Sequence, residues 1–264
     1  MAANLSFPGL TLSAGSKDSA SVLAIQKRLN AVGCGPVEED AIFGAETLEA
    51  VQLFQARSVD QFGTPLKVDG RVGPMTWATL FAIAIEPQVV SSSSVLFSQT
   101  LVTAGKEVGV REEPPGSNRG PRVDQYLRSV GLNPAEGSFA WCAAFIYFCF
   151  DQACMALSRK NPVIRTAGVL EHWDLAGARG VHRLSADECQ AEPSLVQPGM
   201  IFIITTGGGH GHSGLLEEVR GMALTTIEGN TNEGGSREGI GVFRRTSRRI
   251  SDMNRGFIDY NQHS

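Results

Sequence analysis

The feature that most constrains the fold is a run of twelve apolar residues, FAWCAAFIYFCF, from Phe139 to Phe150. The run is too short to cross a bilayer, but it suits a helix buried in a globular core. The segment before it, residues 133–138, contains Pro, Gly and Ser and reads as a loop, so Cys142 is expected in the first turn of the helix. A helix N-terminus favours a thiolate because its unpaired N–H groups carry partial positive charge. Cys142 is therefore either a nucleophile or an ordinary core residue, and partners elsewhere must decide.

Composition sets the broad class of protein. With 264 residues, 42% of them hydrophobic and 19% charged, the chain has room for two soluble domains. A net charge of −4 and a pI near 5.8 argue against nucleic acid or an anionic membrane as the main partner. The basic cluster is interpreted as a solvated strand edge; its members are Arg244, Arg245, Arg248 and Arg249. The odd number of cysteines, five, does not resemble a disulfide framework.

The first eighty residues contain an internal repeat. DAIFGAETL begins at Asp40 and DGRVGPMTW begins at Asp69, twenty-nine positions later (69 − 40). Each copy reads as a turn followed by a helix start, and another helix with a Gly stop precedes both copies. The pattern predicts three helices, with Trp77 in the packing between them and the loops at Asp40 and Asp69 as candidate ligand sites.

This pattern resembles the three-helix peptidoglycan-binding domain of many cell-wall hydrolases. The resemblance covers residues 15–83 and rests on the doubled turn and on pairs such as Phe54-Gln55 in the second predicted helix. It implies a binding domain at residues 1–84 with peptidoglycan as its partner. The polar segment EPQVVSSSS then indicates a linker at residues 85–95.

The rest of the chain, residues 96–264, reads as an α+β domain. Helical periodicity over residues 95–109, a polar loop, a short helix over residues 121–130 and the apolar helix come first. Short β-rich runs follow, MIFIIT, HSGLLEEV, ALTTIE and GIGVFRR, separated by Gly, Asn and polar turns. They predict an antiparallel meander, so helices precede strands.

A catalytic cysteine needs a base and a group that orients the base. His212 opens one predicted strand, and Glu228 and Asn230 close the next. If these strands form a hairpin through the turn at Arg220-Gly221, His212 lies beside Glu228 or Asn230. The sequence thus predicts a thiol version of the nucleophile, base and orienter arrangement.

The four segments WCAAF, PGMIFI, HSGLL and IEGN occur in this order, and this half resembles the CHAP family of cysteine, histidine-dependent amidohydrolases and peptidases. The resemblance spans about residues 105–260 and implies a papain-like fold, no cofactor, and cleavage of amide bonds in peptidoglycan. It implies Cys142 as nucleophile, His212 as base, and Glu228 and Asn230 as orienters. Ser213 departs from the Val or Thr usual after the histidine.

Two alternatives remain open. His210-Gly211-His212 is an HxH pair of the kind used by lysostaphin-type zinc endopeptidases, but no further His with Asp at the required interval completes the site. A protein that binds the wall and carries an inactive hydrolase domain would fit if Cys142 proved unreactive. On the cysteine interpretation, the candidates for substrate binding are Asn118, Tyr126, Trp141 and His210.

Delivery follows from the start of the sequence. Residues 1–16 lack a positive segment followed by an apolar core, so no secretory signal is expected, although peptidoglycan lies outside the membrane. The expected route is release through holin pores as a phage endolysin, and the alternative is injection as an antibacterial effector with an immunity protein. A monomer without membrane insertion is expected. The sequence does not predict which peptidoglycan bond is cut.

Overall fold

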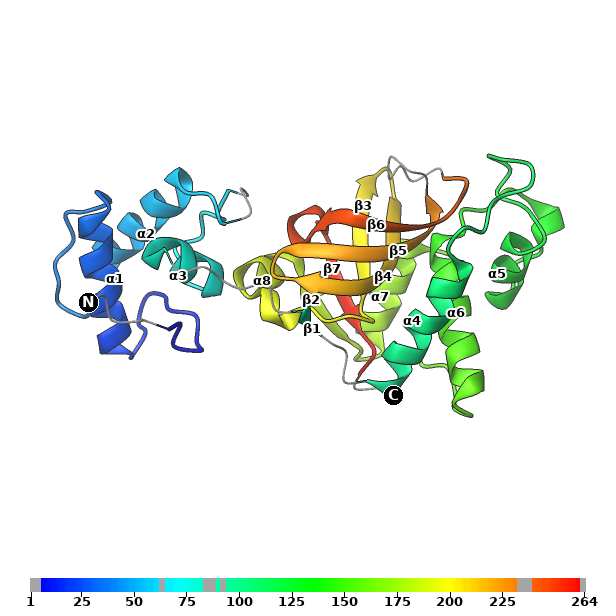
Figure 1. The fold of residues 1–264 in the computed structure, drawn as a ribbon, viewed down its shortest axis with the longest axis horizontal. Helices are drawn as coiled ribbons and strands as arrows, with labels where there is room; N and C mark the ends of the chain where they lie inside the picture. The colour runs from blue at the N-terminus through cyan, green and yellow to red at the C-terminus, as the bar shows by residue number, and fades with distance from the viewer. Residues whose placement is uncertain (1–5, 62–64, 83–88, 91–93, 232–238, 262–264) are drawn as a thin grey trace. The chain divides into compact units, whose positions relative to one another are not determined.

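The structure is a computed structural model that describes residues 6–61, 65–82, 89–90, 94–231 and 239–261. The chain divides into two compact units, residues 1–87 with 190–193 and residues 88–189 with 194–264. The first unit contains three helices, α1 (Ser19–Ala31), α2 (Ala45–Arg57) and α3 (Pro74–Phe81), as the periodicity predicts (Figure 1). Its core includes Trp77, which is 1% exposed and therefore packs as expected.

The sequence repeat is also a repeat of hydrogen bonds. Gln26 Nε2 donates to Asp40 Oδ1 at 2.7 Å and to the carbonyl two residues beyond that Asp at 3.0 Å. Gln55, twenty-nine positions on (55 − 26), donates in the same way to Asp69 Oδ1 at 3.0 Å and to the corresponding carbonyl at 2.9 Å. Each glutamine oxygen accepts a turn N–H in return. The two Asp side chains thus close turns, which accounts for the repeat without a ligand.

Replacing Gln26 by Ala should loosen this unit. Gln26 is 1% exposed, and its loss leaves buried groups of the first turn without partners. We expect the free energy of unfolding of the N-terminal unit to fall by about 2–4 kcal/mol. Hydrogen exchange of the α1 and α2 amides measures this locally, and exposed Glu49→Ala is the matched control. Equal exchange in the two variants would contradict the assigned role.

The second unit is α+β, as predicted. Its helices are α4 (Val95–Glu107), α5 (Val123–Ser129), α6 (Cys142–Ala156), α7 (Val169–Ala178) and α8 (Ala186–Ala191), with 3₁₀ turns at Pro134–Glu136, Pro193–Leu195 and Ile250–Asp252. Its strands are β1 (Val89–Val90), β2 (His182–Ser185), β3 (Ile201–Gly207), β4 (His210–Arg220), β5 (Ala223–Thr231), β6 (Gly241–Arg249) and β7 (Gly256–Asp259).

These strands form one antiparallel sheet. In the described residues its order is β2-β7-β3-β4-β5-β6, and β1 pairs with the end of β4. The four consecutive neighbours β3 to β6 are the predicted meander. Part of the predicted linker, residues 85–88 and 91–93, lies outside the described residues, but Val89–Val90 is a strand rather than a linker. No helix in the described ranges is long and apolar enough to span a membrane.

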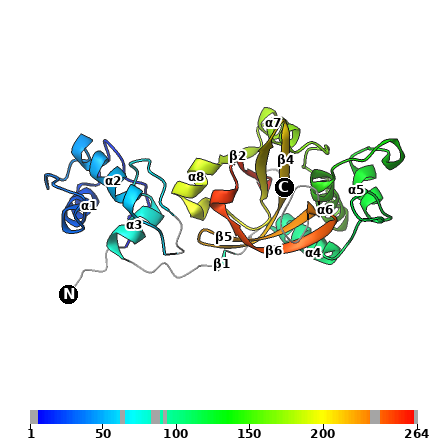
Figure 2. The same ribbon diagram turned by 90° about the horizontal axis from the view of Figure 1, so that it is seen from above.

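Helix α6 occupies the centre of this unit. It packs against α4, α5, β4 and β5, and α4 and α5 lie with it beside the sheet (Figures 1 and 2). Phe145 and Phe150 of the apolar run are fully buried, and each contributes about 1.5–3 kcal/mol through burial. Strand β5 approaches α6 closely at Gly229, where a Cβ atom would lie 2.7 Å from the Cβ of Phe145. The backbone at residue 229 therefore requires glycine.

Candidate active site

Cys142 is the first residue of α6, as predicted. Residues 138–141 before it are not helical, and Trp141 provides no side-chain cap. The first N–H groups of a helix have no partner within the helix, so they present partial positive charge beside the thiol. Cys142 is only 2% exposed. The nucleophile candidate thus sits at the positive end of a buried helix.

The predicted hairpin of β4 and β5 brings His212 and Glu228 together. Leu215 pairs with Ile227, so Glu228 lies opposite Gly214 and diagonal to His212, on the same face of the sheet. His212 Nε2 is 2.8 Å from Glu228 Oε2, and both side chains are buried. A Cβ atom at residue 214 would lie 2.9 Å from Glu228 Cγ, so glycine there makes room for the carboxylate.

The electrostatics of the three groups are coupled. Burial disfavours the charged form of His212, but its interactions with Cys142 and Glu228 outweigh this and raise its pKa to about 9. Burial likewise opposes ionisation of Glu228, yet bonds from Arg248 and His212 lower its pKa to about 2. For Cys142, burial raises the thiol pKa, but His212 and Ser213 together lower it by more, so the thiol pKa lies below its usual value. The three shifts all favour the charged forms, a thiolate, an imidazolium and a carboxylate.

The histidine nitrogens have different neighbours. Nε2 is hydrogen-bonded to Glu228, and Nδ1 is buried with no hydrogen-bond partner among the described residues. This leaves Nδ1 as the ring atom available to the thiol of Cys142. Ser213 is fully buried next to the histidine and also lowers the pKa of the Cys142 thiol. The sequence analysis noted Ser213 as a departure from the family pattern and assigned it no role.

Among the described residues, the hydrogen bonds of the Asn230 amide go to groups other than the histidine. Its φ of 52° turns the backbone into the left-handed region where β5 has a pairing irregularity. With the amide oriented to satisfy its neighbours, its oxygen accepts from the Trp141 N–H at 3.1 Å and its nitrogen donates to Asn118 Oδ1 at 3.3 Å. Asn118 Nδ2 donates to Ser138 Oγ at 3.0 Å. Glu228 is therefore the residue hydrogen-bonded to His212, and Asn230 ties the segment before Cys142 to the Asn118 loop.

The structure corrects two of the predicted substrate-binding residues. Tyr126 and Trp141 are both fully buried, so neither side chain lines an open cleft. Tyr126 donates its hydroxyl to Glu107 at 2.6 Å, and Trp141 Nε1 donates to Glu112 at 2.8 Å. Large aromatic side chains stabilise a core while a buried partner satisfies their polar end, and this explains both positions. His210 is exposed at the start of β4, and Asn118 is half-buried, so both stay predictions.

The basic cluster on β6 is only partly a solvated edge. Arg244 pairs with Glu217 outside the site, but Arg248 binds both oxygens of Glu228 at 2.9 Å. Arg245 Nε lies 3.7 Å from Glu228 Oε1. The interpretation of all four arginines as solvated was therefore wrong for these two, which are 12% and 15% exposed at the side chain.

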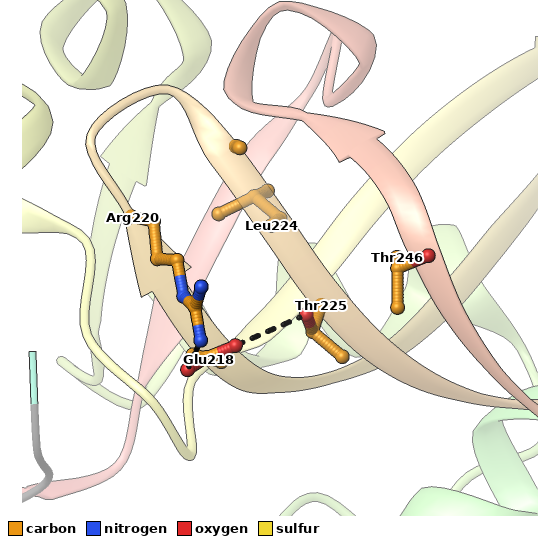
Figure 3. A pocket seen from close by; sticks show the side chains of 6 residues that line it. Glu218, Arg220, Leu224, Thr225 and Thr246 are labelled. Atoms are coloured by element: carbon orange, nitrogen blue, oxygen red, sulfur yellow. Dashed lines mark hydrogen bonds and ion pairs between the residues drawn. The ribbon is translucent and has the colours of Figure 1, made fainter. Parts of the chain in front are cut away.

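Two further features lie outside this constellation. Among the described residues, no group of three or more His, Cys, Asp or Glu side chains is placed to hold a metal ion. A pocket of about 270 Å³ opens at the hairpin turn of β4 and β5 (Figure 3). Its lining consists of Glu218, Arg220, Ala223, Leu224, Thr225 and Thr246. None of the predicted site residues lines this pocket.

Comparison with known proteins identifies the first unit. Residues 18–80 match the family model of a peptidoglycan-binding domain, which includes α1, α2 and α3. The chain therefore carries a peptidoglycan-binding domain and has a function associated with the cell wall. No match was found among curated proteins or among solved structures. The matched residues end before the segment that contains Cys142.

Proposed function

We propose that the second unit is a cysteine-dependent hydrolase that cleaves an amide bond in the peptide part of peptidoglycan. The observation that carries the proposal is the buried His212–Glu228 pair at 2.8 Å, with the His212 ring coupled to a thiol at a helix N-terminus. A buried histidine whose pKa is raised by a carboxylate and a thiol is typical of an activated nucleophile. The peptidoglycan-binding domain supplies the substrate class.

In the proposed mechanism the Cys142 thiolate attacks the amide carbonyl, and the C–N bond breaks after a tetrahedral intermediate forms. The Cys142 backbone N–H, free at the helix start, donates to the oxyanion. His212 then gives its proton to the leaving amine, and a thioester remains on Cys142. Water, deprotonated by His212, hydrolyses the thioester. Glu228 holds the ring in place throughout.

Inhibition of wall digestion tests this chemistry. We expect iodoacetamide, a small reagent suited to a thiol that is 2% exposed, to abolish the loss of turbidity of purified sacculi, and EDTA to leave it unchanged. Mass spectrometry should place the alkyl group on Cys142. Sedimentation with sacculi should remain intact, because binding belongs to the other unit. Loss with EDTA alone would overturn the proposal in favour of a metal enzyme.

The bond and the delivery route are separate parts of the proposal. Mass spectrometry of digested muropeptides distinguishes an N-acetylmuramoyl-L-alanine amidase from a peptide endopeptidase. For delivery we favour a phage endolysin, and an adjacent holin gene would support it. An adjacent gene for a protein that binds this chain and blocks Cys142 would instead support an injected effector.

A further inference from the structure

The two arginines at Glu228 reach it because β6 contains a bulge. Side chains three apart on a regular strand point to opposite faces, so Arg245 and Arg248 should not share one target. Here Arg245 pairs with Thr226 and Arg248 pairs with Leu224, so three steps on β6 match two steps on β5. The extra residue turns both arginines to the face that carries Glu228.

The carboxylate of Glu228 is fully occupied. Arg248 Nε and Nη2 bind its two oxygens at 2.9 Å each, which is a bidentate pair. Thr226 Oγ1 donates to Oε1 at 2.7 Å, and His212 takes Oε2 at 2.8 Å. Since both oxygens are held from more than one side, the carboxylate cannot rotate without breaking several bonds. Arg248 thus helps to fix the orientation of the Glu228 carboxylate toward the histidine.

The charge of Glu228 is shared between two partners. Its carboxylate is fully buried, and Arg248 binds its two oxygens at 2.9 Å each. A protonated His212 therefore faces a carboxylate whose charge is already shared with a guanidinium. The attraction between Glu228 and the imidazolium is weaker than it would be for an isolated carboxylate at the same distance.

We propose that Arg248 is a positioning residue for the base: its fork keeps Glu228 Oε2 on the ring of His212, and its charge limits how strongly Glu228 retains the imidazolium proton. The fork orients the ring toward Cys142. The charge lets His212 release its proton to a leaving amine. The catalytic consequence rests on the proposed function, whereas the effect on His212 can be measured without any substrate.

Titration of the histidine ring by NMR, in full-length protein with labelled histidine, tests the charge. We expect Arg248→Met to raise the pKa of His212 by roughly one pH unit, because it removes a positive charge that binds the same Glu228 oxygen as the imidazole. Arg248→Lys, which keeps the charge, should change it by less than about 0.3 unit. The matched control is Arg244→Met on the same strand, which removes a charge paired with Glu217 and should leave His212 unchanged. An unchanged or lowered pKa in folded Arg248→Met would overturn the role of the charge.

Digestion of sacculi tests the fork. Arg248→Lys folds with the charge in place but cannot bind both oxygens, so we expect turnover to fall about tenfold while thermal stability stays close to that of the wild type. Wild-type turnover in Arg248→Lys would overturn the positioning role, and this variant also serves if Arg248→Met does not fold. If wild-type protein digests no wall, the proposed function fails, but the titration still decides what Arg248 does to His212.

Discussion

Replacing Cys142 by Ser should abolish wall digestion while leaving wall binding unchanged. A serine hydroxyl in the same place is a far weaker nucleophile, because it is not ionised by the histidine to the extent that a thiol is. We expect turnover to fall by at least about 10³-fold, as for the loss of a nucleophile elsewhere. Turbidity of sacculi measures digestion, and co-sedimentation measures binding through the first unit.

The matched control lies on the same helix. Cys154 is 1% exposed, and burial raises the pKa of its thiol, whereas the pKa of the Cys142 thiol is lowered. Cys154→Ser should therefore digest sacculi at close to the wild-type rate, provided that circular dichroism shows the same fold. Full activity in Cys142→Ser would rule out the thiol mechanism. If the wild-type protein and Cys154→Ser both fail to digest the wall, a binding protein with an inactive hydrolase domain becomes the better interpretation.

Replacing Glu228 by Gln should be costly for both activity and stability. The amide cannot balance the guanidinium of Arg248, and removing one partner of a buried ion pair typically costs about 3–5 kcal/mol. The imidazolium of His212 also loses its partner, so turnover should fall by about 10²–10⁴-fold. Urea unfolding and sacculus turbidity measure the two effects. Glu217→Gln, at a half-buried position whose ion pair lies outside the site, should cost less than about 1 kcal/mol.

The same variant changes the pH dependence of stability. The folded pKa of Glu228 is lowered from 4.5 to about 2, so its contribution is present above pH 4.5 and is lost as the pH falls toward 2. The folded pKa of His212 is raised from 6.5 to about 9, so its contribution is present below pH 6.5 and is lost as the pH rises toward 9. In Glu228→Gln, the free energy of unfolding should depend less on pH in both of these pH ranges. A wild-type stability profile in the variant would contradict the ion pair.

The parts of the site that sequence could predict are those fixed by periodicity. The apolar run placed Cys142 at the start of α6, and strand alternation with a short turn placed His212 beside the end of β5. Periodicity could not predict whether Glu228 or Asn230 forms the hydrogen bond to His212. It depends on the left-handed backbone at Asn230, which breaks the alternation locally.

Other expectations failed for related reasons. Four arginines in six positions suggest an exposed strand, and only the bulge in β6 turns Arg245 and Arg248 inward. Tyr126 follows an irregular polar loop, which suggested a cleft, yet its ring packs at the centre of the domain beside Trp141. Pattern analysis assigns faces by regular spacing, so a single inserted residue or an unforeseen buried carboxylate reverses the assignment.

The close approach of β5 to α6 at Gly229 affects how a site of this kind could diversify. At this point the main chain of β5 packs directly on the Cβ of Phe145 in α6, with no side chain between them. This contact fixes the distance between the helix that carries Cys142 and the hairpin that carries His212. Loops around the site can then lengthen, shorten or change charge, and so acquire a new target bond, while the reacting atoms keep their spacing. In a mutational library we expect residue 229 to tolerate no other amino acid, whereas the exposed loop at residues 113–116 accepts many.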